Sequence, residues 1–205
     1  MDDRVGVLGG TFDPPHRAHL ELAAAAREQL KLSSVIFMPA GNPWRKSQSK
    51  VSPAAVRMEM VAAAVQNISW AKVSDLEALN PEPTYTAETL KRIKAEDPGK
   101  DLWFILGADA LSDMAYWHSP SEIVRCARLA VAGRDGVEPR AGKELVGLIP
   151  EVQSFIDPIS MAAFSDSSTS YRQHIGDTGI LGSGQETAEG VLEIIRREGL
   201  YGSVD

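Results

Sequence analysis

The stretch GGTFDPPHRAH, from Gly9 to His19, gathers residue types that suit the binding of an anion such as phosphate. Gly9 and Gly10 have no side chain, so a ligand can approach the backbone closely there. His16 and His19 are three residues apart and share one face of a helix, whose first N–H groups also attract anions. The stretch therefore predicts a phosphate site made of backbone and imidazole donors.

Two better-known phosphate patterns are absent from this stretch. It has neither the G-x-G-x-x-G of dinucleotide-binding folds nor the G-x-x-x-x-G-K-[ST] of P-loop proteins, which disfavours a hydride-transfer enzyme and a P-loop kinase. A zinc site is also disfavoured, because the chain has one cysteine, Cys126, and its other histidines are His118 and His174. We therefore expect no metal bound by the protein's own side chains.

Composition narrows the class of protein. The chain has 205 residues, 43% of them hydrophobic, which suffices for one sizeable core. The formal net charge of -7 and the pI of 5.2 argue against a nucleic-acid partner. No signal peptide is recognisable, and no apolar run approaches the roughly 20 residues that span a bilayer. We expect a cytoplasmic protein without internal disulfides or a membrane partner, and the sequence leaves a homo-oligomer open.

Apolar runs typical of strands alternate with segments of helical periodicity. Strands are expected over residues 4–8, 34–41, 70–75, 101–106, 128–133 and 152–157. Helices are expected over residues 14–30, 52–65, 84–96, 119–127, 165–175 and 185–200. This alternation predicts an α/β fold, a Rossmann-like parallel sheet with helices on both faces. We expect one domain over residues 1–205, with a small helical C-terminal part from about residue 165.

The turns after three strands should face one site, because ligands bind beyond the carboxyl ends of parallel strands. These turns begin at Gly9, Gly41 and Gly107. Asp13 stands before the first predicted helix and is interpreted as its N-cap rather than as a catalytic acid.

Two motifs carry a resemblance to a known family. GGTFDPPHRAH resembles the nucleotidyltransferase signature (G)-x-[ST]-F-D-P-x-H-x-G-H, with Ala18 in place of the usual glycine, and DSSTSYR at 166–172 resembles I-S-S-T-x-[IV]-R. Between them lie PAGNPWRK, PTYTAETL, GADAL and Trp117. This ordered set covers nearly the whole chain and is similar to nicotinate-nucleotide adenylyltransferases, and the PWRK form is most similar to actinobacterial members.

The resemblance implies the transfer of AMP from ATP to nicotinate mononucleotide, which gives deamido-NAD and pyrophosphate in NAD biosynthesis. ATP would enter as its Mg2+ complex. The acceptor phosphate needs little deprotonation, so positioning and preorganised positive donors should do most of the catalysis. Pantetheine-phosphate adenylyltransferase, nicotinamide mononucleotide adenylyltransferase and a non-catalytic nucleotide sensor on the same fold stay open as alternatives.

The resemblance also assigns roles to individual residues. The catalytic set would be His16, His19 and Arg172, which bind phosphate oxygens. The ATP-binding set would be Gly9, Gly10, Thr11, Phe12, Lys46, Gly107, Asp109, Ser167, Ser168 and Thr169, with Asp109 on a ribose hydroxyl and Lys46 on pyrophosphate. The nicotinate mononucleotide pocket would hold Tyr85, Thr86 and Trp117, with Trp117 stacked on the pyridine ring. The roles of Arg45 and Arg134 stay open, as does the order of residues 42–52 and 176–190 without ligand.

Overall fold

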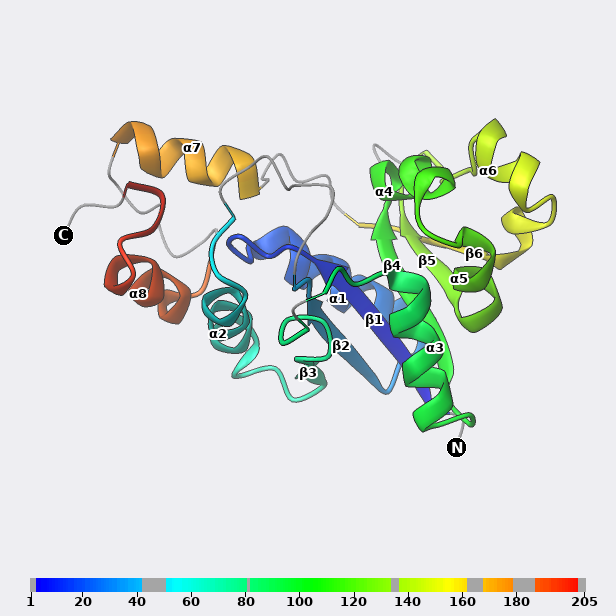
Figure 1. The fold of residues 1–205 in the computed structure, drawn as a ribbon, viewed down its shortest axis with the longest axis horizontal. Helices are drawn as coiled ribbons and strands as arrows, with labels where there is room; N and C mark the ends of the chain where they lie inside the picture. The colour runs from blue at the N-terminus through cyan, green and yellow to red at the C-terminus, as the bar shows by residue number, and fades with distance from the viewer. Residues whose placement is uncertain are drawn as a thin grey trace. The chain divides into compact units, whose positions relative to one another are not determined.

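The computed structural model of the chain describes residues 3–41, 51–80, 82–133, 137–161, 168–178 and 187–202. Its strands form a six-stranded sheet in the order β3-β2-β1-β4-β5-β6 (Figure 1). The strands are β1 (Arg4–Gly10), β2 (Ser34–Pro39), β3 (Ala71–Val73), β4 (Asp101–Gly107), β5 (Arg128–Ala132) and β6 (Ile156–Ile159). β4 pairs in parallel with both β1 and β5, and β5 pairs in parallel with β6. The predicted α/β fold with a parallel sheet is confirmed.

Helices separate the strands along the chain. The α-helices are α1 (Arg17–Leu30), α2 (Ala54–Val65), α3 (Thr86–Glu96), α4 (Ala108–Asp113), α5 (Pro120–Cys126), α6 (Lys143–Leu148), α7 (Ser168–Thr178) and α8 (Glu189–Arg197). Among the described residues, short 3-10 helices are η2 (Met114–Tyr116), η3 (Val152–Phe155) and η4 (Leu200–Gly202). Each predicted helix has a counterpart, whereas α4 and α6 were not among the predicted helices.

The chain divides into two compact units, and the first takes its residues from Met1–Gly9, Leu22–Ile36 and Thr84–Ala163. Neighbouring strands β4 and β5 form its centre. Ile105, Leu129, Ala130 and Val131 are completely buried there. Such uninterrupted apolar strands are typical of a parallel sheet that is covered on both faces.

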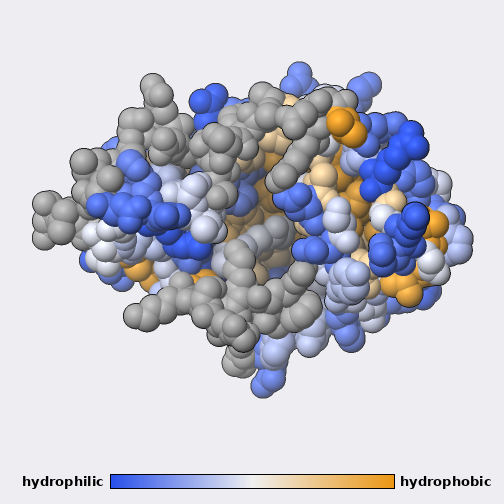
Figure 2. Space-filling model, turned by 90° about the horizontal axis from the view of Figure 1, so that it is seen from above, coloured by the Kyte–Doolittle hydropathy of each residue, from blue (hydrophilic) through white to orange (hydrophobic). Residues whose placement is uncertain are grey.

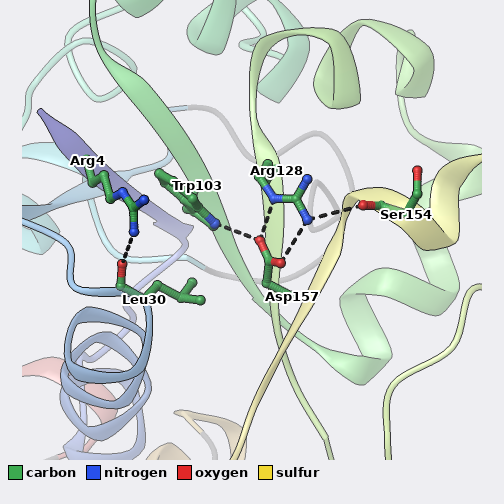
Figure 3. A network of polar contacts seen from close by, with 6 residues as sticks. All are labelled: Arg4, Leu30, Trp103, Arg128, Ser154 and Asp157. Carbon is green, nitrogen blue, oxygen red and sulfur yellow. Dashed lines mark hydrogen bonds and ion pairs between the residues drawn. The ribbon is translucent and has the colours of Figure 1, made fainter. Parts of the chain in front are cut away.

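A polar network crosses the beginning of these strands (Figure 3). Asp157 on β6 accepts hydrogen bonds from the indole Nε1 of Trp103 at 2.8 Å and from Nε and Nη2 of Arg128 at 2.7 and 2.8 Å. The guanidinium of Arg4 lies 5.5 Å from the Trp103 ring and donates to the carbonyl of Leu30. The network joins β1, β4, β5 and β6, so we interpret it as structural.

The second unit takes its residues from Gly10–Glu21, Phe37–Pro83 and Phe164–Asp205. A hydrophobic cluster joins α2, α7 and α8, and consists of Met60, Tyr171, Ile175, Val191, Leu192, Ile194 and Ile195. Gly190 lies in α8, and a Cβ atom there would be 3.2 Å from the Cβ of Ala63 on α2. Gly190 is the second residue of α8. Here it lets the two helices approach closely.

One predicted strand is misplaced. Only the end of the stretch 152–157 belongs to β6, because its first residues form η3. The backbone N–H of Val152 donates to Ile149, that of Ser154 donates to Glu151, and the Ser154 hydroxyl bonds to the same carbonyl. These local bonds occupy groups that a strand would need for its ladder.

The surface is mostly hydrophilic on the face shown in Figure 2, with hydrophobic residues in smaller areas between. Large exposed hydrophobic side chains in the described ranges are Leu79, Tyr116, Val137, Val146 and Leu148. Scattered residues of this kind are normal for a protein surface. Within the same ranges, no helix is both long enough and apolar enough to cross a membrane.

Candidate phosphate site

Residues 11–16, which we call the signature loop, connect β1 to α1 in the second unit. Phe12 has a φ of 49°, in the left-handed region that residues other than glycine rarely adopt. Its side chain is 1% exposed and packs with its ring centroid 4.9 Å from that of His19. A Cβ atom on Gly10 would lie 3.1 Å from the Phe12 ring, so a larger residue would crowd this turn. The packing of Phe12 thus fixes the approach to the histidine pair.

His16 and His19 lie where the signature loop meets α1, with ring centroids 3.9 Å apart. Because α1 begins at Arg17, the prediction that both histidines lie within the helix is wrong for His16. The backbone N–H of His16 donates to Nδ1 of His19 at 3.2 Å, and the N–H of His19 donates to the carbonyl of His16 at 3.0 Å. The first bond is one half of a capping box, with an imidazole in the role that Glu usually takes. Because Nδ1 of His19 accepts, a neutral His19 carries its proton on Nε2.

Side chains from two other segments donate hydrogen bonds to carbonyl groups of the signature loop. Arg172 donates from Nη1 to the carbonyl of Asp13 at 2.7 Å, and the Ser168 hydroxyl donates to that of Pro14 at 3.0 Å. The Thr187 hydroxyl donates to the carbonyl of Pro15 at 2.9 Å. Two residues of the second predicted motif, on α7, therefore contact the first motif directly. Their predicted contacts with phosphate stay a prediction.

Thr169 lies beside Arg172 on α7. Nη2 of Arg172 lies 3.4 Å from the Thr169 hydroxyl, on an exposed part of the helix. The guanidinium thus spans from the signature loop to the first turn of α7. A planar donor fork at a helix start is well suited to an anion.

Arg57 on α2 is a residue that the sequence analysis missed. It is 1% exposed and donates to three backbone carbonyls, those of Thr11, Gly41 and Ser52, at 2.7, 2.9 and 2.9 Å. Burial lowers the pKa of Arg57, and the nearby charge of Asp13 opposes this effect. An arginine inside the apolar run AAVRMEMVAAAV is the signal that could have found it.

The interpretation of Asp13 as a helix cap is wrong. The helix begins four residues later, at Arg17, and the Asp13 carboxylate is 2% exposed. Its oxygens accept hydrogen bonds from the Tyr201 hydroxyl at 2.6 Å and from the backbone N–H of Ser52 at 3.2 Å. Two prolines stand between Asp13 and His16, so the helix cannot begin at Asp13 with a regular first turn of N–H donors.

The residues predicted to bind nicotinate mononucleotide lie in the first unit. Tyr85 precedes α3, which begins at Thr86, and its ring centroid is 4.4 Å from that of His118. Trp117, the neighbour of His118, packs edge-on against Phe104 with centroids 6.0 Å apart. The structure thus brings Tyr85 to the residue beside Trp117. The indole Nε1 of Trp117 is buried without an acceptor among the described residues.

The ends of neighbouring strands β1 and β4 also lie in this unit. Gly9 is near the end of β1 and Gly107 ends β4, so both stand at the carboxyl edge of parallel strands. Around Gly107 a Cβ atom would meet nothing within 4 Å, which leaves space beside the backbone. Asp109 follows in the first turn of α4. These positions match the predicted edge of the sheet.

Some predicted residues lie outside the described residues, namely Lys46, Ser167, Arg45 and Arg134. Their roles stay predictions. Within the described part of the chain, no three His, Cys, Asp or Glu side chains cluster as metal ligands would.

Comparisons with known proteins place this geometry in a family. The cytidylyltransferase-like family model matches residues 7–174, a span that includes both motifs. A Dehalococcoides mccartyi protein called a probable nicotinate-nucleotide adenylyltransferase is 37% identical over 201 residues, 97% of each chain. A Saccharopolyspora erythraea protein of the same name is 35% identical over 202 residues, 98% of this chain and 91% of the relative.

A solved structure shares the fold. The Plasmodium falciparum nicotinic acid mononucleotide adenylyltransferase, complexed with APC, superposes with a TM-score of 0.76 over 98% of each chain, at 18% identity. The resemblance seen in the two motifs is confirmed by these relatives. The chain belongs to the cytidylyltransferase-like family, and within it to the nicotinate-nucleotide adenylyltransferases.

Proposed function

We propose that the protein transfers AMP from ATP to the phosphate of nicotinate mononucleotide, releasing pyrophosphate and forming deamido-NAD. The observation that carries the proposal is the contact between His16 and His19 beside the signature loop. It is supported by relatives that align over nearly the whole chain and are called probable nicotinate-nucleotide adenylyltransferases. A further structure of the Plasmodium falciparum enzyme is complexed with NaAD. That complex is a property of the relative and supports the proposal by similarity.

The reaction joins two polyanions, so its difficulty is electrostatic. The acceptor oxygen attacks the α-phosphorus of ATP, and the bond from that phosphorus to the bridging oxygen of pyrophosphate breaks. Negative charge builds on the α-phosphate oxygens and on the leaving pyrophosphate. Fixed donors aimed at those oxygens lower the barrier without reorganisation.

His19 is the donor whose tautomer the structure defines. Its Nδ1 accepts from the His16 N–H, so we assign the Nε2–H as the donor to a phosphate oxygen. His16 precedes the helix by one position, and the two rings are in contact. Arg172 would complete the set, since its guanidinium spans from the signature loop to Thr169.

The acceptor would be recognised in the first unit. Trp117 supplies an aromatic face for the pyridine ring. Thr86 supplies a hydroxyl and a backbone N–H at the start of α3, where a carboxylate is favoured. Asp109 would accept from a ribose hydroxyl. Mg2+ would arrive with ATP as part of the substrate, where it neutralises phosphate charge.

The experiment is an assay of pyrophosphate release from ATP with three acceptors: nicotinate mononucleotide, nicotinamide mononucleotide and phosphopantetheine. We expect the highest kcat/KM with nicotinate mononucleotide and loss of turnover when EDTA removes Mg2+. Higher turnover with phosphopantetheine would assign the protein to the other transferase activity. ATP binding without pyrophosphate release from any acceptor would indicate a nucleotide sensor.

A further inference from the structure

The buried carboxylate of Asp13 is held by groups from distant parts of the second unit. Oδ1 accepts from the hydroxyl of Tyr201, 188 residues later, at 2.6 Å, and Oδ2 accepts from the backbone N–H of Ser52 at 3.2 Å. With 2% of the residue exposed, water cannot replace these donors. The position of the Asp13 side chain therefore depends on Tyr201 and Ser52.

Tyr201 stands in an unusual backbone conformation that delivers its hydroxyl to Asp13. It lies in η4 with a φ of 60°, in the left-handed region, and η4 contacts both α7 and α8. Burial raises the pKa of the Tyr201 hydroxyl, and the hydrogen bond to Asp13 raises it further. The hydroxyl therefore keeps its proton at neutral pH and acts as a donor.

Asp13 connects this donor to the phosphate site. It belongs to the signature loop between Phe12 and His16, and its carbonyl accepts the 2.7 Å hydrogen bond from Arg172. A displacement of the Asp13 side chain would shift the loop backbone and the guanidinium together. Donors aimed at a transition state lose much of their effect when they move by about 1 Å.

We propose that Tyr201 is a positioning residue for adenylyl transfer, an inference that rests on the proposed function. Its hydroxyl acts through Asp13 to hold the signature loop and Arg172 in the geometry that the transition state requires. The C-terminal turn of the chain, far from the motifs in sequence, is therefore part of the machinery of the site.

The primary test is Tyr201→Phe, which removes the hydroxyl and keeps the ring. We expect kcat to fall about 10-fold, the scale of one hydrogen bond to a charged group, with KM for both substrates within about twofold of wild type. A wild-type chain without activity refutes the proposed function, and this inference with it. An active wild type with unchanged kcat in Tyr201→Phe, or with a change in KM alone, refutes this inference and leaves the proposed function standing.

A control variant separates positioning from stability. Leu192→Ala opens a cavity in the cluster of α2, α7 and α8 without touching Asp13. It should lower the midpoint of thermal unfolding more than Tyr201→Phe does, and retain kcat. An equal loss of kcat in Leu192→Ala would overturn the inference.

The double variant tests whether Tyr201 acts through Asp13. Asp13→Ala should lower kcat, and adding Tyr201→Phe should lower it no further, because the hydroxyl has then lost its acceptor. Losses that multiply would show that the two residues act independently and would contradict the proposed coupling. Far-UV circular dichroism of each variant establishes that the compared chains are folded.

Discussion

The Nη1 atom of Arg57 lies 2.7 Å from the carbonyl oxygen of Thr11, 46 residues earlier in the chain. The same guanidinium donates to the carbonyls of Gly41 and Ser52, which stand on either side of residues 42–50. One buried cation thus ties the signature loop to the segments before and after that stretch. Burial lowers the pKa of this guanidinium, and the charge of Asp13 is close enough to oppose that effect.

Arg57→Met should destabilise the protein strongly. The variant leaves three carbonyls without their donor and removes one cation close to the buried Asp13, and breaking such an arrangement costs about 3 kcal/mol or more. Urea unfolding followed by circular dichroism measures the free energy of unfolding. The matched control is Arg92→Met, because Arg92 forms an exposed pair with Glu96 that should contribute less than about 0.5 kcal/mol. Equal stability in the two variants would contradict the role of Arg57.

Asp157→Asn should change how stability depends on pH. Burial raises the pKa of Asp157, but hydrogen bonds from Arg128 and Trp103 outweigh it and leave the pKa below its ordinary value. The carboxylate therefore stabilises the fold above the unfolded pKa of about 4, and this contribution is lost as pH falls through the lower folded pKa.

We expect Asp157→Asn to be about 1 kcal/mol less stable than wild type at pH 7, with the difference shrinking below pH 4. The midpoints of urea unfolding of the variant and the wild type at pH 7, 5 and 3 measure this difference in stability. The exposed Asp101→Asn serves as the control and should follow the wild-type profile. A constant gap between Asp157→Asn and wild type across these pH values would show that the network of Figure 3 does not hold an ionised carboxylate.

Gly190→Leu should loosen the packing of α8 on α2. Even a Cβ atom at Gly190 would lie 3.2 Å from the Cβ of Ala63, so a larger side chain must push the helices apart, at a cost of about 1–3 kcal/mol. Gly147→Leu is the control, since a Cβ atom on that glycine of α6 meets nothing within 4 Å. Thermal unfolding should show a lower midpoint for Gly190→Leu and an unchanged or higher one for Gly147→Leu. The reverse order would contradict this packing.

Local sequence signals predicted most of the fold. The apolar run DLWFIL became β4, and the alternation of strands and helices indicated the parallel sheet. The strand predicted at 152–157 was displaced, because hydrogen bonds three residues apart compete with the ladder there. The short helix α6 has six residues and little periodicity, so no local pattern marked it.

The sequence predicted only those site residues that stand close together in one short motif. The spacing of His16 and His19 predicted that their rings lie together, although α1 begins only at Arg17, after His16. Arg57 and Tyr201 act through carbonyl and carboxylate groups that lie 46 and 188 residues away in the chain. No spacing rule connects such residues, since tertiary structure alone brings them together.

The most direct measurement is kcat for two substitutions of His19 with ATP and nicotinate mononucleotide. In His19→Asn the amide retains an acceptor near the position of Nδ1 for the His16 N–H, but the Nε2 donor is lost. We predict a fall in kcat of at least about 100-fold with an unchanged far-UV spectrum, and a smaller fall in His19→Gln, whose amide reaches the Nε2 position. His174→Ala, an exposed residue of α7, should keep wild-type kcat. Wild-type kcat in a folded His19→Asn variant would contradict the claim that the histidine pair carries the chemistry.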